Sequence, residues 1–252
     1  MCIRDRAAAI AAKKNKTVTV IEMADRVMNR TVDPQISEYY LNLHQSYGVK
    51  FHFNTSLETI NKASGSLEVV CSDGTEVKAD SVLIGAGVIP NIELAEDSGI
   101  YCDNGIIVDE FGQTNFKNVY ACGDCTNHPN KILKKNLRLE SVHNAMEQAK
   151  TVASSVLNKP MEYSQVPWFW SDQYDHKLQI VGLSGDHDLV TMRGNTNDAK
   201  FMLFYTKDEE LIAVDAINNP KEFLISRKLV ANKVKIKPNV ISDLNTNLND
   251  LI

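Results

Sequence analysis

Helix and strand patterns alternate along the first half of the chain, and this alternation restricts the fold more than any other feature. An Ala-rich helix pattern at residues 7–14 precedes a short apolar strand pattern at 17–22. An amphipathic helix pattern at 33–47 ends just before Gly48 and precedes a second strand pattern at 49–53. Because strands joined through helices usually pair in parallel, the alternation predicts an α/β fold with a mainly parallel sheet.

The middle of the chain continues this pattern with shorter elements. Residues 55–80 contain short strand patterns with a turn at 72–75, which predicts a β-meander attached to the sheet. The further elements that we expect are strands at 81–84, 106–109 and 119–122 and helices at 92–97 and 141–157.

The pattern changes after Pro167, where strand patterns follow one another without intervening helices. They occupy residues 177–183, 189–193, 200–206 and 211–217, and a helix pattern follows at 220–232. We therefore predict a separate α+β unit of antiparallel strands and helix, with a boundary near residues 158–166.

Composition excludes several classes of protein. The net charge of -5 is spread along the chain and offers no basic face for a phosphate backbone, so nucleic acid is not an expected partner. The longest apolar run, residues 81–90, is about half of the ~20 residues that cross a membrane, so no membrane span is expected. The five cysteines lack paired secretory spacing, which favours a reducing cytoplasm.

Residues 1–6 differ in character from the rest of the chain. The short Ala-rich stretch after them, followed at once by Lys13 and Lys14, falls short of the about 7 to 15 apolar positions of a signal peptide. These six residues resemble translated adapter sequence, and we expect them to be non-native.

Glu22 ends the first apolar strand, directly after a helix. In a dinucleotide-binding unit an acid at this position accepts hydrogen bonds from the adenosine ribose and repels the additional phosphate of NADP. Glu22 therefore favours NADH, although a surface glutamate at a strand end is the simpler interpretation of this residue alone.

Gly85, Gly87 and Pro90 follow the strand predicted at 81–84 and precede a helix. Glycines at such a crossover let the backbone pass close to a bound dinucleotide, and the proline stiffens the turn. A common tight turn would have the same residues, so the value of this signal depends on the motif about 25 residues later in the chain.

Residues 114–124 carry the most specific pattern, in which Thr114 precedes a Tyr-Ala-Cys strand that ends in Gly123 and Asp124. The glycine permits close approach of a ligand, and the aspartate stands at the carboxyl end of a strand, where α/β folds bind ligands. This pattern resembles the second FAD-binding motif of the two-dinucleotide-binding flavoprotein reductases. The resemblance implies that Asp124 accepts a hydrogen bond from the ribityl chain of FAD.

Two further segments, residues 138–145 and 167–174, resemble those of the ferredoxin reductases that serve cytochromes P450 and aromatic-ring dioxygenases. The first implies a helix start whose amides face the flavin ring. The second implies that Trp170 lies beside the isoalloxazine, while Trp168 is expected to be a core residue. The residues implied at the helix start are Ser141, Val142, His143 and Asn144.

The resemblance covers residues 7–245 and implies a partial Rossmann-like flavoprotein with two dinucleotide-binding domains and a C-terminal α+β domain. The expected divisions are a partial NAD-binding domain at 7–86, the second segment of an FAD-binding domain at 87–163, and the C-terminal domain at 164–252. The implied activity transfers a hydride from NADH to FAD and then single electrons to a two-iron two-sulfur ferredoxin that serves an oxygenase. Neither a catalytic acid or base nor a metal ligand is expected.

Ferredoxins are usually acidic, and a basic cluster precedes the helix expected at 141–157. We expect this cluster to steer docking of the ferredoxin, although a solvated loop would look the same. The residues of this cluster that are expected to dock are Lys134, Lys135 and Arg138, and the family resemblance adds Lys150 on the helix itself.

Three alternatives stay open. The first is a rubredoxin-, nitrite- or disulfide-type flavoprotein reductase, of which the disulfide type lacks support because residues 167–174 contain no His-Pro pair. The second is a dithiol centre at Cys122 and Cys125, which is disfavoured because Gly123 and Asp124 between them form the FAD motif. The third is a truncated chain without independent activity, which would bind FAD poorly.

Overall fold

The computed structural model describes residues 3–252, which form two compact units. The first unit extends to Gly87 and includes the distant segment Ser171–His176. The second unit comprises Val88–Trp170 and Lys177–Ile252. Residues 1 and 2 of the segment that we expected to be non-native lie outside the described residues, whereas its remaining residues belong to a helix.

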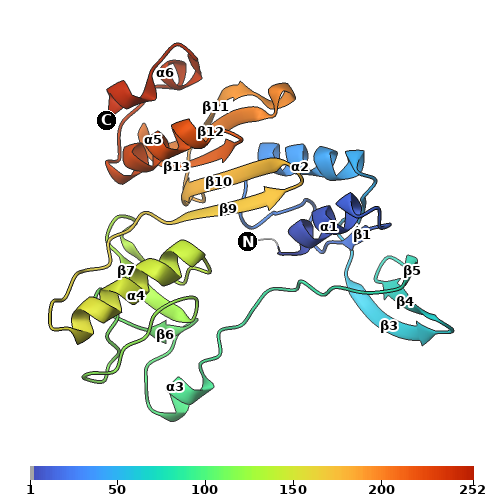
Figure 1. The fold of residues 1–252 in the computed structure, drawn as a ribbon, viewed down its shortest axis with the longest axis horizontal. Coiled ribbons are helices and arrows are strands. Elements are labelled where there is room, and N and C mark those ends of the chain that lie inside the picture. The colour runs from blue at the N-terminus through green and yellow to red at the C-terminus, as the bar shows by residue number, and fades with distance from the viewer. Residues whose placement is uncertain (1–2) are drawn as a thin grey trace. The chain divides into compact units, whose positions relative to one another are not determined.

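The first unit contains a small parallel sheet and a separate meander (Figure 1). Its elements are α1 (Ile3–Lys13), β1 (Thr19–Ile21), α2 (Pro34–Ser46), β2 (Lys50–His52), β3 (Leu57–Ala63), β4 (Ser66–Cys71) and β5 (Glu76–Ala79). Strands β1 and β2 pair in parallel, with Thr19 opposite Lys50. Ala8 and Ala12 of α1 pack with Val20 and Val49, because small side chains let a helix approach a strand closely.

Helix α2 starts where the sequence predicts. The side chain of Asp33 accepts a hydrogen bond from the Gln35 amide at 2.9 Å, and Pro34 occupies the first turn, where its missing N–H costs nothing.

His44 of α2 joins this helix to the segment Ser171–His176. Its ring is fully buried, and its two nitrogens contact the Tyr174 hydroxyl and the Gln173 side-chain oxygen, each at 2.8 Å. Tyr47 stacks on Tyr174 with ring centroids 3.9 Å apart. Polar and aromatic contacts therefore hold residues that are more than 120 positions apart in the sequence.

Two predicted strands are wrong. Residues 81–84 form no strand, because they make no strand pairing with any of the described residues. The side chains of Leu83 and Ile84 are 59% and 69% exposed. A parallel strand needs a neighbour that takes its backbone hydrogen bonds, and the sheet of β1 and β2 does not extend to this segment. Residues 119–122 make only an isolated bridge, between Tyr120 and Gln113.

The physical reason for the second error is local backbone geometry. Asn118 and Gly123 have φ of 64° and 92°, so the chain bends at both ends of this four-residue segment. The segment is too short between these bends to continue a regular strand.

The second unit starts with α3 (Glu93–Asp97) and includes a long helix, α4 (Val142–Val156), next to short strands (Figure 1). The strands are β6 (Ile106–Ile107), β7 (Thr126–Asn130) and β8 (Lys135–Leu137). Strand β6 pairs in parallel with β7, and β7 pairs antiparallel with β8. The sequence patterns did not predict β7 or β8, which are rich in asparagine and lysine rather than β-branched residues.

The C-terminal part is a five-stranded sheet in the order β11-β12-β13-β10-β9. The strands are β9 (Trp168–Gln173), β10 (His176–Gly182), β11 (Leu189–Asn195), β12 (Lys200–Lys207) and β13 (Glu210–Ile217), followed by α5 (Pro220–Ala231) and α6 (Pro238–Ser242). Short 3-10 helices lie at Thr196–Asp198 and Leu248–Leu251. Helix α5 packs on β13, and Phe223 and Leu229 enter a core with Phe204 and Val214. The predicted antiparallel strands followed by a helix are confirmed.

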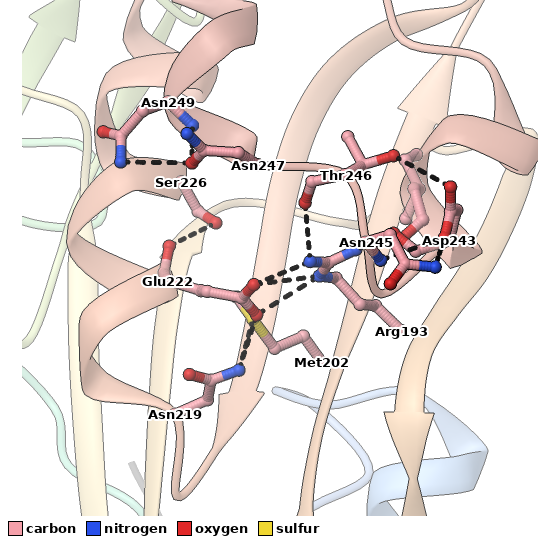
Figure 2. A network of polar contacts seen from close by, with 11 residues as sticks. Arg193, Met202, Asn219, Glu222, Ser226, Asp243, Asn245, Thr246, Asn247 and Asn249 are labelled. Carbon is pink, nitrogen blue, oxygen red and sulfur yellow. Dashed lines mark hydrogen bonds and ion pairs between the residues drawn. The ribbon is translucent and has the colours of Figure 1, made fainter.

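Arg193 of β11 organises the end of the chain (Figure 2). Its side chain is only 3% exposed, and its guanidinium donates to Glu222 of α5 at 2.8 Å. The same group donates to the carbonyl oxygens of Ile241, Asp243 and Thr246. One cation thus satisfies a carboxylate and three backbone acceptors, which fixes the end of α6 and the segment after it to the sheet.

Candidate cofactor site

Glu22 follows β1 and is a partly buried carboxylate. The Ala24 amide donates to it at 2.8 Å, and Arg4 forms an ion pair with it. Burial alone would raise the pKa of Glu22, but the Ala24 hydrogen bond and Arg4 outweigh burial, so its pKa is lowered. Glu22 is therefore held as an anion at the end of the strand, as an acceptor of ribose hydroxyls requires.

Gly85 and Gly87 lie in the same unit as Glu22. A Cβ atom on Gly85 would stand 3.1 Å from the Cβ of Arg4, so the glycine allows close approach to the first turn of α1. Gly87 has φ of 97°, a conformation that glycine adopts without strain, and the Arg30 side chain lies beside it. The structure thus places both predicted glycines next to side chains that surround Glu22, whereas Pro90 belongs to the second unit.

Thr114 closes a turn rather than pointing outward. Its hydroxyl donates to the Val119 carbonyl at 3.1 Å and accepts from the Phe116 amide at 3.2 Å. The side chain is buried, so its role in the motif is to shape the backbone that leads to Gly123.

Gly123 is tied to α4 by a residue that sequence reasoning missed. The Gly123 amide donates to the side-chain oxygen of Gln148 at 2.6 Å, and the Thr126 hydroxyl donates to the same oxygen at 2.8 Å. A Cβ on Gly123 would meet only Ala145, at 3.9 Å, so the space beside this backbone is open. The only sequence signal for Gln148 is a polar residue within a predicted helix, which is too common to identify a role.

Asp124 is exposed next to the start of α4. Burial of its carboxyl group and the charge of Glu140 raise its pKa, while the Ser141 amide and Arg138 act in the opposite direction. Arg138 also donates to the Asp124 carbonyl at 3.2 Å and to Glu140 at 2.7 Å. The acid therefore stands among an arginine, a second acid and a helix N-terminus.

Ser141 and Asn144 build the start of α4. The Ser141 hydroxyl accepts from the Asn144 amide at 3.1 Å, which is an N-cap. The Asn144 side chain donates to the Leu139 carbonyl and accepts from the Tyr163 hydroxyl, so both its polar atoms are occupied inside the protein. The Ser141 cap accepts only from the Asn144 amide. The amides of Val142 and His143, also in the first turn of α4, have no acceptor within the helix.

Trp168 lies between His143 and Trp170 in a chain of ring contacts, with ring centroids 5.5 Å apart for His143 and Trp168 and 5.3 Å apart for the two tryptophans. Arg227 of α5 lies over the Trp168 ring at 5.0 Å. Trp168 is only partly buried and touches Phe223 on one side, which accords in part with the core role predicted for it.

Two buried donors or acceptors in this group have no hydrogen-bond partner among the described residues, His143 Nδ1 and Trp168 Nε1. A buried polar atom without a partner is costly, and an ordered water can supply the missing hydrogen bond. Burial and the charge of Arg227 lower the pKa of His143, which favours the neutral imidazole.

The remaining sequence hypotheses concern sulfur and metals. Cys122 and Cys125 are free thiols, and burial together with the neighbouring Cys125 raises the pKa of Cys122. A raised pKa opposes the thiolate that a redox dithiol uses. The described residues contain no group of three or more His, Cys, Asp or Glu side chains placed to hold a metal ion.

Three of the four residues expected to dock a partner already have acidic neighbours. Lys135 lies 3.4 Å from Asp186, Arg138 pairs with Glu140, and Lys150 pairs with Glu147 at 2.6 Å. No ion pair is found for Lys134 within residues 3–252. None of the described helices is long and apolar enough to cross a membrane.

The chain belongs to the pyridine nucleotide-disulphide oxidoreductase family, whose profile matches residues 6–149. A second profile, the reductase C-terminal family, matches residues 168–252. Together these matches confirm the predicted flavoprotein-reductase fold class.

Similar proteins confirm the resemblance to ferredoxin reductases. Among curated proteins, putidaredoxin reductase of Pseudomonas putida is 37% identical over 97% of this chain and 59% of its own length. Rhodocoxin reductase of Rhodococcus erythropolis is 38% identical over 96% of this chain and 57% of its own length. The crystal structure of the ferredoxin reductase for the CYP199A2 system of Rhodopseudomonas palustris has a TM-score of 0.93 at 36% identity, over 96% of this chain and 60% of that one. The chain thus spans somewhat less than two thirds of these relatives.

Proposed function

We propose that residues 7–252 act in a flavin-dependent ferredoxin reductase, which takes a hydride from NADH and passes single electrons to a two-iron two-sulfur ferredoxin that serves an oxygenase. The observation that carries this proposal is the Gly123–Gln148 hydrogen bond, which holds the Gly-Asp turn against the helix that starts at Ser141. The names of the relatives support the same activity, since they are reductases of ferredoxin-type partners.

In this proposal the domains follow the divisions predicted from the sequence, with NAD bound by residues 7–86, FAD by 87–163 and further contacts from 164–252. Glu22, Gly85, Gly87 and Pro90 would serve the NADH. The residues proposed to serve FAD are Thr114, Gly123, Asp124, Ser141, Val142, His143, Asn144 and Trp170.

The side chains of this chain would bind and orient rather than react. Glu22 would accept ribose hydroxyls, and Asp124 would accept a ribityl hydroxyl. The first-turn amides of α4 would donate to the flavin ring edge, where a helix N-terminus favours developing negative charge. Bound FAD supplies the hydride acceptor and the single-electron donor.

A partner that is acidic would meet Lys134, Lys135, Arg138 and Lys150, of which Lys134 is free to pair. We place the reductase in the cytoplasm, because its free cysteines suit a reducing compartment.

The chain's only two tryptophans, Trp168 and Trp170, allow a direct test of flavin binding. Adding FAD to the purified chain should quench tryptophan fluorescence, and Trp170→Phe should remove most of that quenching while leaving the affinity nearly unchanged. Adding NADH and a two-iron ferredoxin to the FAD-loaded protein should then bleach the ferredoxin absorbance. Reduction of a small disulfide without any ferredoxin reduction would contradict the proposal and favour the disulfide-type alternative.

A further inference from the structure

His128 of β7 is a buried histidine that has no part in the function proposed above. It is 1% exposed, and within residues 3–252 neither of its ring nitrogens has a hydrogen-bond partner. Its ring makes a T-shaped contact with the ring of Tyr163, with centroids 4.8 Å apart. A titratable ring therefore lies in the interior of the second unit, against the side chain of a tyrosine.

Tyr163 anchors the segment that connects α4 with β9. Residues 157–162 and Ser164 are exposed, whereas Tyr163 is 4% exposed. Its amide donates to the Glu110 carbonyl and its hydroxyl to the side-chain oxygen of Asn144, each at 2.8 Å. Burial, and to a smaller extent Glu147, raises the pKa of Tyr163, so the hydroxyl keeps its proton and remains a donor at neutral and acidic pH.

The Tyr163 contact reaches the start of α4 through Asn144. The Asn144 side chain is buried, and it donates to the Leu139 carbonyl at 3.1 Å while it accepts from Tyr163. The Tyr163 hydroxyl therefore fixes the side chain that holds the turn before α4, and with it the direction of the first-turn amides.

A proton on His128 would have no stabilising partner in this interior. Burial lowers the pKa of His128, the Thr126 backbone acts in the opposite direction, and no charged side chain of the described chain contributes. Strand β6 carries no charged residue, and the charged groups of the other surrounding elements pair among themselves, as Glu147 with Lys150, Glu162 with Lys131, Lys135 with Asp186 and Arg138 with Glu140. Because a buried cation without a carboxylate is costly, the protonated ring gains by reaching water. The shortest route to water is displacement of Tyr163, whose neighbours in the sequence already lie at the surface.

We propose that His128 and Tyr163 are positioning residues that make flavin binding depend on pH: the neutral His128 ring supports Tyr163 against Asn144, and the protonated ring displaces Tyr163 and frees the start of α4. This inference rests on the proposed function, because it takes FAD as the ligand of the first-turn amides. Flavin affinity is then highest above about pH 6.5, where histidine is neutral, and declines as the pH falls below that value.

The test follows the FAD affinity of the purified chain by tryptophan quenching between pH 7.5 and pH 5.5. Asp124 and His143 also titrate at the site, so each variant is compared with the native profile. His128→Phe keeps an aromatic ring that takes up no proton, and its affinity should fall about three- to tenfold less over this range than that of the native chain, the effect of one hydrogen bond. Tyr163→Phe should already bind FAD about three- to tenfold more weakly at pH 7.5, because it lacks the hydroxyl. His187→Phe replaces an exposed histidine of the same unit and should keep the native profile.

Hydrogen exchange of the FAD-free chain tests the support without the ligand. Protection of the Asn144 and Ala145 amides, which bond to Ser141, should decline from pH 7.5 to pH 5.5 in the native chain and stay nearly constant in His128→Phe. Equal profiles of these two proteins in both measurements would overturn the proposal. The expected exchange pattern with no FAD binding at any pH would overturn the proposed function and leave the link from His128 to α4 standing. Native FAD affinity in Tyr163→Phe would overturn the role of the link in flavin binding alone.

Discussion

Arg193 and Glu222 lie 29 positions apart in the sequence, yet the guanidinium and the carboxylate form a bidentate pair with contacts of 2.8 and 3.2 Å. Asn219 donates to the same carboxylate at 2.7 Å (Figure 2). The arginine is nearly buried, and its remaining donors reach the carbonyl of Ile241 within α6 and two carbonyls after this helix. This arrangement connects the edge strand β11, helix α5 and the end of the chain through one side chain.

Removing the arginine should therefore destabilise the second unit strongly. Arg193→Ala leaves Glu222 with Asn219 as its remaining side-chain donor and removes the donor of three carbonyl oxygens, and loss of one partner of a buried pair costs about 3 to 5 kcal/mol. Chemical denaturation should show this loss, and amides near Ile241 should exchange faster with deuterium. Lys233→Ala breaks the exposed pair with Glu210 and should cost less than about 1 kcal/mol. A similar cost for the two variants would argue against the connection.

The same pair predicts an acid sensitivity. Burial alone would raise the pKa of Glu222, but hydrogen bonding to Arg193 outweighs it, so the pKa lies below its ordinary value of 4.5. A lowered carboxyl pKa contributes stability that is complete above about pH 4.5 and is lost as the pH falls through the folded-state pKa. Glu222→Gln should be less stable than the native chain at neutral pH and should lose less stability between pH 5 and pH 3. Parallel stability curves for the two proteins would contradict this.

His44 predicts a second pH dependence, in the first unit. Burial lowers the pKa of His44 below its ordinary value of 6.5, so the unfolded chain takes up a proton before the folded chain does. Its contribution to stability is complete above about pH 6.5 and declines as the pH falls below that value. We express amide exchange in α2 as protection, the exchange rate relative to that of an unfolded peptide at the same pH. In His44→Gln this protection should change less between pH 7.5 and pH 5.5 than in the native chain. His52→Gln, on the neighbouring strand β2, should leave the dependence as it is.

Asp124 should control flavin affinity. Asp124→Asn keeps the size of the side chain but removes the ionised acceptor, and a hydrogen bond to a charged group is worth about 1.5 to 3 kcal/mol. FAD affinity, followed by tryptophan quenching, should fall at least about tenfold. Asp97→Asn on the exposed end of α3 supplies the comparison and should bind FAD normally. An unchanged affinity for Asp124→Asn would remove this residue from the proposed site.

Lys134 offers the clearest test of the proposed ferredoxin docking, because it has no ion pair within the described part of the chain. Lys134→Glu should slow reduction of an acidic ferredoxin several-fold at low ionic strength, because opposite charges steer the encounter. The difference should shrink at physiological salt, where the Debye length is about 8 Å. Reduction rates that do not change with salt would count against electrostatic docking, and Lys62→Glu tests whether net charge alone is responsible.

The sequence predicted those elements whose determinants are local. Helix α4 begins at Val142, one residue after the start of the helix predicted at 141–157, because helical periodicity is a local signal. Four of the five strands of the C-terminal sheet, β10 to β13, fall within a few residues of their patterns for the same reason, whereas β9 was not predicted. Residues 81–84 carry an equally clear apolar pattern, yet a strand also needs a hydrogen-bonding neighbour, and no pattern within the segment reports one.

In the candidate site, too, residues with a local sequence signal were predicted and residues that act through distant contacts were not. Gly123 and Asp124 could be found because glycine and aspartate adjoin each other in the sequence. Gln148 could not, since it acts on a backbone 25 residues away. Polar partners at long separation leave no periodic trace in a single sequence.

The return of Ser171–His176 to the first unit has a consequence for exchanging parts between related reductases. The backbone passes from one unit to the other at three points, after Gly87, after Trp170 and after His176. A chimera that transplanted only the residues up to Gly87 would separate His44 and Tyr47 from Gln173 and Tyr174 and place them against the recipient's own segment. Moving the first unit whole between relatives therefore requires two separate stretches of gene, one up to Gly87 and one for Ser171–His176.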